Sequence, residues 1–184
     1  MQHEWWKNAS GIMTHDSDEF QKLVDEAGSE KLVIVDFFMP QCGYCVKFMP
    51  DWNRVVEDIK AEFGDKVQFL KVDGIHDRYT SDRYDINSFP SFIALEPGSH
   101  GDKWTDFHAN RTHSNMKRWI KTLASKFHIE APSATGGKAT DNAAANLQNN
   151  HALGAPLPLA AGQPSADFFK QQMEENHRMS DAIN

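Results

Sequence analysis

The chain of 184 residues suits one domain of ordinary size plus an extension. Its hydrophobic fraction of 40% is enough for a packed core, and its formal net charge of −7 argues against nucleic-acid partners, which would need a basic surface. No apolar run approaches the roughly 20 residues that span a bilayer, so we expect no membrane contact.

The first half of the domain predicts a helix, a strand and a long helix, in that order. Asp16 or Ser17 is expected to cap the first helix, whose apolar face would hold Phe20, Leu23, Val24 and Ala27. Residues 32–38 form an almost continuous apolar run, which is typical of a strand buried on both faces of a sheet. A pair of cysteines follows at positions 42 and 45, and helical spacing of apolar residues then continues to Phe63.

The second half predicts a strand over residues 67–72 and a short polar helix or turn over 76–85. Residues 92–95, after Pro90, predict another strand, and residues 104–107 a hairpin partner beside it. Apolar spacing over residues 116–127 indicates a closing helix. From the strand over residues 32–38 onward, the elements follow the order β-α-β-α-β-β-α, which predicts an α/β domain. The domain is expected to cover residues 12–128, preceded by an N-terminal extension at 1–11.

The C-terminal part of the chain has a different composition. Between Ala131 and about Gln163 there is no aromatic residue, and Ala, Asn, Gly and Pro dominate. Such a segment cannot bury enough apolar surface to offset its chain entropy, so we expect a disordered linker over residues 129–163. A short helix is expected over residues 164–184, with Phe169 and Met173 on one side.

The two cysteines, Cys42 and Cys45, are the only ones in the chain and stand three positions apart. A disulfide-rich secreted scaffold would hold more of them, and a structural zinc site needs four ligands. The pair is therefore interpreted as a redox centre, with no metal and no cofactor expected. Unpaired N–H groups and the helix dipole would favour a Cys42 thiolate at the start of the helix, which makes Cys42 the expected exposed nucleophile. Cys45, one turn further along, would be more buried and would resolve the mixed disulfide.

Asp36 places a carboxylate inside the apolar run before the cysteines. A charged group there is costly unless it is paired or functional, so Asp36 is either a satisfied core acid or a proton acceptor for Cys45.

Several stretches together resemble the thioredoxin superfamily, and within it the protein disulfide isomerase type of domain. The resemblance covers residues 12–128 and rests on the residues Val35 to Cys45, Pro50, Lys71-Val72-Asp73, Phe89-Pro90-Ser91, Phe107 to Thr112 and Trp119-Ile120. It implies a thioredoxin fold, in which a central mixed sheet is flanked by helices.

The resemblance also implies residue roles. Asp36, with Lys71 as its partner, would take the proton of Cys45. A cis peptide bond before Pro90 would aim backbone groups at the substrate, although most loop prolines are trans. Arg111 would tune the second cysteine, unless it is an ordinary solvated surface arginine.

Substrate contact is expected at Gly43, Tyr44, Phe89 and Pro90. Three positions depart from the pattern of the family. Gln41 stands where tryptophan is usual, and Val46 where lysine is usual. Tyr44 lacks the charge that a histidine in a Gly-His motif can carry.

These observations lead to the hypothesis of a thiol–disulfide oxidoreductase of the protein disulfide isomerase type. Its partners would be protein thiols and disulfides, together with a redox partner such as glutathione, a reductase or an oxidase. Two alternatives remain open: a cytosolic thioredoxin-like reductase, and a non-enzymatic interaction subunit that docks through its C-terminal tail.

The compartment also remains open. The first residues contain no apolar segment of a signal peptide, and Asp181 to Asn184 do not resemble a KDEL-type signal. We expect the cytoplasm if Met1 is the true start, and the lumen of the endoplasmic reticulum if a signal peptide was removed.

Overall fold

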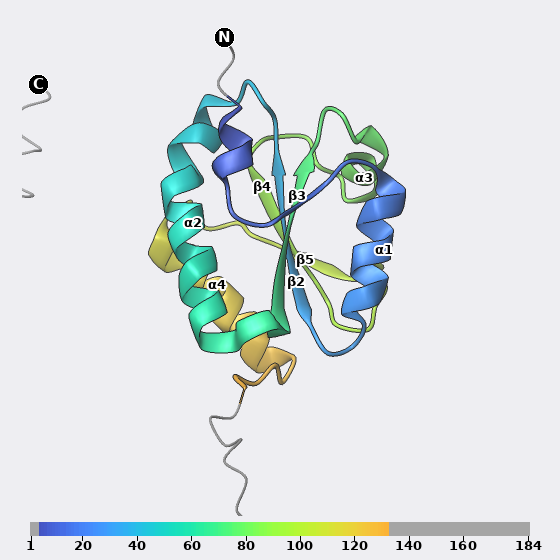
Figure 1. The fold of residues 1–184 in the computed structure, drawn as a ribbon, viewed down its shortest axis with the longest axis vertical. Helices are drawn as coiled ribbons and strands as arrows, with labels where there is room; N and C mark the ends of the chain where they lie inside the picture. The colour runs from blue at the N-terminus through green and yellow to red at the C-terminus, as the bar shows by residue number, and fades with distance from the viewer. Residues whose placement is uncertain (1–3, 133–184) are drawn as a thin grey trace, which may run out of the picture. The chain divides into compact units, whose positions relative to one another are not determined.

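The computed structural model describes residues 4–132, which fold around a five-stranded mixed sheet (Figure 1). The strands are β1 (Ile12–Thr14), β2 (Leu32–Phe38), β3 (Val67–Asp73), β4 (Ser91–Leu95) and β5 (Trp104–Asp106), in the spatial order β1-β3-β2-β4-β5. Strands β1, β3 and β2 are mutually parallel, whereas β4 is antiparallel to β2 and to β5. The expected mixed sheet is confirmed, and so is the hairpin that ends in β5.

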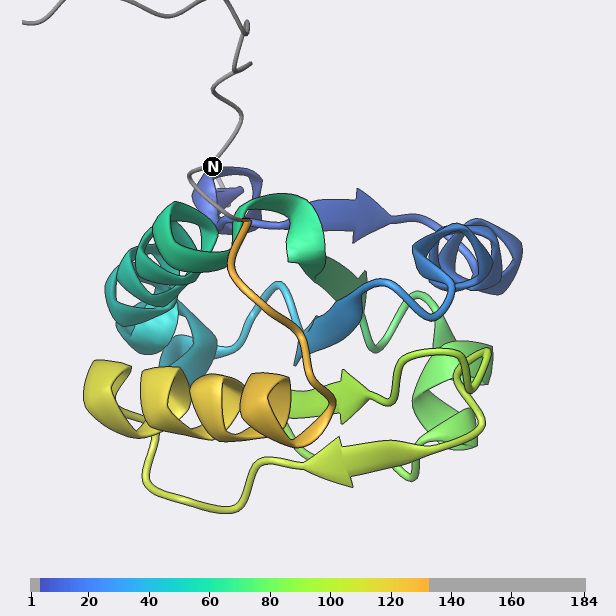
Figure 2. The same cartoon turned by 90° about the horizontal axis from the view of Figure 1, so that it is seen from below.

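Four α-helices cover the two faces of the sheet. Helices α2 (Gly43–Phe63) and α4 (His113–Lys126) lie on one face, and α1 (Ser17–Ala27) and α3 (Arg78–Arg83) on the other (Figure 2). Two short 3-10 helices, η1 (Trp5–Asn8) and η2 (Gly64–Lys66), complete the elements. The side chain of Asp16 accepts a hydrogen bond from the Glu19 amide, so Asp16 rather than Ser17 caps α1.

Strand β2 lies in the middle of the sheet, and every one of its residues is buried, as its apolar run predicts. Its side chains alternate between the two faces. Leu32, Ile34 and Phe38 pack into the cluster under α2 and α4, and Val33, Val35 and Phe37 into the cluster under α1 and α3. This alternation places Asp36 on the α2 side, which is also the side of Cys45.

The packed region extends past both of the expected domain limits. Trp5 and Ala9 are buried in the α2-side cluster, and so is Ile129, whose amide bonds the Ala124 carbonyl. The expected linker from residue 133 onward and the expected helix over 164–184 lie outside the described residues. Within residues 4–132, no helix has the length and apolar character needed to cross a membrane.

Candidate active site

A disulfide between Cys42 and Cys45 stands at the start of α2. Cys42 is the N-cap residue and has an extended backbone, with φ −84° and ψ 106°. Its Sγ accepts a hydrogen bond from the Cys45 amide at 3.1 Å. The first amides of a helix have no partner within the helix, and they favour negative charge nearby. The placement of Cys42 at a helix N-terminus is therefore as predicted.

The two cysteines are equally covered in this disulfide form. Their exposed fractions are 5% for Cys42 and 4% for Cys45, so the expected contrast between an exposed and a buried cysteine is absent here. The Phe89 carbonyl oxygen lies 3.5 Å from Cys42 Sγ and covers part of it. Between the cysteines, Gly43 is exposed and Tyr44 has 76% of its surface exposed.

Asp36 lies behind the disulfide in a closed part of the core. A cavity of about 10 Å³ is lined by Asp36, Cys45 and Pro90, among others, and has room for about one water molecule. Asp36 Oδ1 has no hydrogen-bond partner among the described residues. Loss of hydration raises the pKa of Asp36 to about 7, although the positive charge of Lys71 lowers it in part.

Lys71 is the neighbour of Asp36 across the β2–β3 pair, but its ammonium is bound elsewhere. Its Nζ donates to the carbonyl oxygens of Trp6, at 2.8 Å, and Ala9, at 2.5 Å. Burial lowers the pKa of Lys71, and the carboxylate of Asp36 partly opposes this shift. Lys71, the expected partner of Asp36, is thus its neighbour in the strand register. The hydrogen bonds of the Lys71 ammonium, however, go to the N-terminal segment.

That segment is part of the site, which the sequence analysis missed. Trp5 and Ala9 line the cavity beside Asp36 and Cys45. The Trp5 ring also packs edge-on against Phe38, with ring centroids 5.5 Å apart. The adjacent tryptophans Trp5 and Trp6, in an otherwise polar stretch, are the signal that was available.

The Phe89–Pro90 peptide bond is cis, as expected. The turn at this bond lies close to Gly74, at the end of β3, where there is no room for a side chain. A Cβ atom on Gly74 would come within 2.3 Å of a Phe89 ring carbon and 3.0 Å of Ser81 Oγ. Gly74 therefore allows the Phe89 ring to lie where it does, and it is a second residue that the sequence analysis overlooked.

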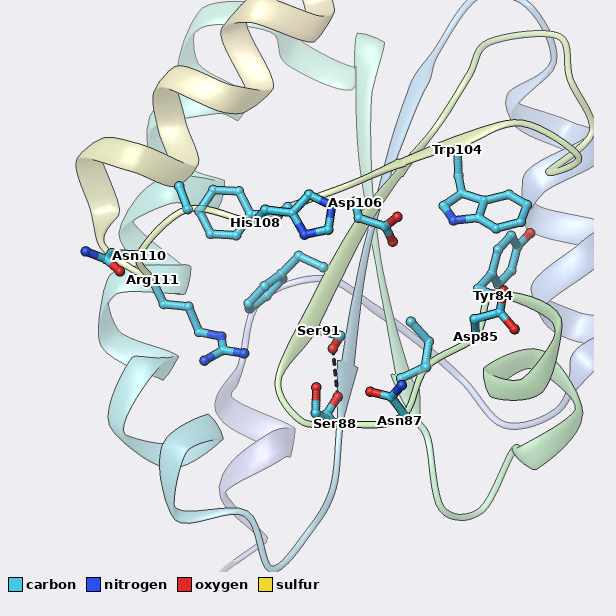
Figure 3. A pocket seen from close by; sticks show the side chains of 14 residues that line it. Tyr84, Asp85, Asn87, Ser88, Ser91, Trp104, Asp106, His108, Asn110 and Arg111 are labelled. Carbon is cyan, nitrogen blue, oxygen red and sulfur yellow. Dashed lines mark hydrogen bonds between the residues drawn. The ribbon is translucent and has the colours of Figure 1, made fainter.

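Arg111 does not line the cavity at Cys45. It is exposed in the loop before α4 and lines a surface groove of about 600 Å³ beside the Pro90 turn (Figure 3). Asn110 and Arg111 lie on one side of this groove, and Tyr84 and Trp104 on the other. Of the expected site residues, the structure gathers Cys42, Cys45, Asp36, Phe89 and Pro90 together, with Lys71 one strand away.

The sequence model of the family described as Thioredoxin matches residues 11–122. Human protein disulfide-isomerase A6 is 29% identical over 99 residues, a match that covers 54% of this chain and 21% of that protein. Thioredoxin from Bacillus subtilis is 34% identical over 70 residues, covering 38% of this chain and 64% of its own length. In both cases the match spans less than two thirds of the relative.

A solved thioredoxin from Malassezia sympodialis superposes with a TM-score of 0.51 and 25% sequence identity, over 63% of this chain and 92% of that one. The superposition, together with the strand order and helix layers, shows the expected thioredoxin fold. The relatives include both disulfide isomerases and thioredoxins.

Proposed function

The chain belongs to the thioredoxin family, and from this premise we propose that it is a thiol–disulfide oxidoreductase of the protein disulfide isomerase type. It would exchange disulfides with protein substrates through Cys42 and Cys45. The observation that carries the proposal is a disulfide capping the N-terminus of α2, with the buried Asp36 in the cavity directly behind it. Neither a metal nor a cofactor is needed for this exchange.

In the reducing direction, the Cys42 thiolate attacks one sulfur of a substrate disulfide. A bond forms between Cys42 and that sulfur, and the other substrate sulfur leaves as a thiolate with the electron pair of the broken bond. The free amides at the start of α2 stabilise the attacking thiolate, because they favour an anion at the Cys42 position.

The second step releases the substrate. The thiol of Cys45 gives its proton to the carboxylate of Asp36, and the resulting thiolate attacks the Cys42 sulfur. The Cys42–Cys45 disulfide forms as the second substrate thiolate leaves, so two electrons have passed from the enzyme to the substrate. Reversal of both steps oxidises a substrate. An acid with a pKa of about 7 can both accept and return this proton near neutral pH.

The surface around Cys42 suits unfolded protein substrates. Tyr44, between the two cysteines, and Ile75, the residue after Gly74, are large side chains that are exposed. Apolar contact is tolerant of sequence, whereas the carbonyl of Phe89 offers a backbone acceptor close to Cys42. Gly43, Tyr44, Phe89 and Pro90 are therefore proposed as the substrate-contacting residues.

A thioredoxin-like reductase is the second candidate, and the similarity to Bacillus subtilis thioredoxin favours it. The third hypothesis, docking through the C-terminal tail, concerns residues outside the described part of the chain.

Two regeneration systems separate the first two candidates. The purified chain is supplied with a disulfide-bonded protein and either glutathione or NADPH with thioredoxin reductase. A disulfide isomerase-type enzyme is expected to turn over with glutathione and to reactivate a protein with scrambled disulfides. Turnover only with the reductase would instead establish a thioredoxin-like reductase.

Cysteine variants provide the matched controls. Cys45→Ser is expected to accumulate a mixed disulfide with the substrate through Cys42, whereas Cys42→Ser should form none. If both variants exchanged disulfides as fast as the unaltered chain, the proposed function would be wrong.

A further inference from the structure

Residues Trp5–Ser10 form a strap across the α2 side of the sheet, and polar side chains of the domain hold its backbone. The Lys71 ammonium bonds the carbonyls of Trp6 and Ala9, and Trp52 Nε1 bonds the carbonyl of Ser10 at 2.8 Å. Asn53 completes the anchoring, since its Oδ1 accepts from the Ser10 amide at 2.7 Å and its Nδ2 donates to the Asn8 carbonyl at 3.0 Å. So many specific bonds indicate a fixed place for this short segment.

At Gly11 the strap joins strand β1, and the backbone there passes very close to Lys71. Gly11 has a φ of 116°, which L side chains rarely adopt, and a Cβ there would lie 3.1 Å from Lys71 Cγ. Glycine at this position therefore lets the strap approach near enough for its carbonyls to bind the ammonium.

The strap also forms a wall of the cavity that holds Asp36. Trp5, with only 7% of its surface exposed, and Ala9 line that cavity together with Cys45. Trp5 Nε1 donates to the Pro40 carbonyl at 2.9 Å, which ties the strap to the loop two residues before Cys42. We therefore expect loss of the Trp5 ring to open this side of the cavity to solvent.

We propose that the strap is a positioning element for proton transfer between Cys45 and Asp36. Trp5 keeps bulk water away from the carboxyl group, and the carbonyls of Trp6 and Ala9 hold the Lys71 ammonium away from it. The catalytic meaning of this arrangement rests on the proposed function, whereas its effect on the Asp36 environment does not.

Few other charges act on Asp36. Lys71 on β3 is the titratable neighbour across the sheet, while the register partner on β4 is Phe92. From α2 the cavity receives Cys45, Phe48, Met49 and Trp52, of which only Cys45 can titrate, and not in its disulfide form. The charged side chains at the start of the strap, Glu4 and Lys7, pair with each other in solvent. Changes in the strap should therefore alter the titration of Asp36 in two ways, by admitting water to the carboxyl group and by moving the Lys71 ammonium.

The test follows the carboxyl group of Asp36 directly, by its carbon-13 chemical shift across a pH titration of the oxidised full-length chain. The cysteines do not titrate in this form, so Asp36 is observed without them. In Trp5→Ala, water enters beside the carboxylate, and the midpoint is expected to fall by roughly one pH unit or more. Trp5→Phe keeps an aromatic ring, but the ring is smaller and has no N–H. We expect the Asp36 midpoint to fall in this variant too, by less than in Trp5→Ala.

Trp104→Ala is the matched control, because Trp104 packs edge-on against Tyr84 on the other face of the sheet. It also removes an indole, one that is more exposed (37% against 7% for Trp5) and does not line the Asp36 cavity, so it should leave the Asp36 midpoint unchanged. If Trp5→Ala does not fold, Trp5→Phe alone decides the matter. An unchanged midpoint in a folded Trp5 variant, or an equal fall in Trp104→Ala, overturns the proposal.

A kinetic measurement links the strap to the reaction. The pH at which release of the mixed disulfide becomes half-maximal should fall in Trp5→Ala, in the same direction as the Asp36 midpoint. A fall in the Asp36 midpoint with unaltered kinetics would contradict the catalytic role of the strap. If the unaltered chain exchanged no disulfides, the proposed function would fail, while the titration of Asp36 would still report on the strap.

Discussion

Asp36 makes the stability of the fold depend on pH. Its pKa is about 7 in the folded chain and close to 3.8 when unfolded, so the folded state binds the proton more tightly. Stability must therefore fall as the pH rises from about 4 through 7, where the unfolded chain has already released this proton. At about 1.4 kcal/mol per pKa unit, the loss reaches as much as about 4 kcal/mol.

Asp36→Asn removes this loss. We expect the variant to be more stable than the unaltered oxidised chain at pH 8, by up to about 4 kcal/mol, and about equally stable at pH 4. Urea unfolding at both pH values measures the difference, with the exposed Asp65→Asn as the control. An equal effect of Asp36→Asn at the two pH values would contradict the argument.

The same variant should separate the two steps of exchange. Asparagine cannot accept the proton of Cys45, so release of the mixed disulfide is expected to slow by about 10²-fold or more, with a smaller effect on the first attack by Cys42. Stopped-flow mixing with a disulfide substrate resolves the two phases. An unchanged release rate would return Asp36 to the role of a buried core acid.

Tyr44 lies between the cysteines and has no basic group. Tyr44→His adds a group that can become positive near the Cys42 thiolate, which stabilises the reduced form and shifts the redox potential in the oxidising direction. The side chain is exposed, so screening should limit the shift to at most about 30 mV, which corresponds to about 1.4 kcal/mol. Equilibration with glutathione measures the potential, and Tyr44→Phe should not move it. A shift in the reducing direction would disprove the charge argument.

At the scale of elements, the junction after β3 supports the Pro90 turn. Gly74→Ala would bring a methyl group within 2.3 Å of the Phe89 ring, so that the ring must shift, and with it the turn whose carbonyl oxygen lies 3.5 Å from Cys42 Sγ. We expect a loss of about 1–3 kcal/mol in stability, as for other overpacked sites, and a clear loss of exchange rate. Thermal melting measures the first effect, with Gly43→Ala as a control because its Cβ would meet nothing within 4 Å. Equal melting temperatures for the two variants would show that the Phe89 ring adapts freely.

Most of the sheet could be predicted from the sequence because its inner strands are long apolar runs, with β2 the clearest case. The three-residue β1 could not, since Ile12, Met13 and Thr14 are too few to show a period.

The site, likewise, could be predicted from the sequence only in part. Cys42, Cys45 and Asp36 are close in sequence to one strand–helix junction, whereas the Lys71 contacts with Trp6 and Ala9 span 65 and 62 residues. Such long-range contacts leave no local pattern.

At the scale of the whole molecule, the described residues contain both hydrophobic clusters and the entire candidate site. We therefore expect a chain that ends at Pro132 to fold, with a melting temperature and exchange rate within error of the full chain. The cut is placed after Ile129, because that side chain is buried in the α2-side cluster. Calorimetry and the exchange assay compare the two chains. A substantially lower melting temperature for the shorter chain would show that residues 133–184 stabilise the domain.

Both margins of the sheet are formed by strands of only three residues, β1 and β5, whereas the inner strands have five or seven. Unpaired backbone at a sheet margin is a template on which another extended chain can assemble. Under the proposed function, the protein would meet such extended chains as substrates. Margins this short offer few consecutive hydrogen bonds, so a client can be held at the cysteines and then leave without being incorporated into the sheet. Short edge strands would thus limit backbone pairing between the sheet and the substrates of the proposed function.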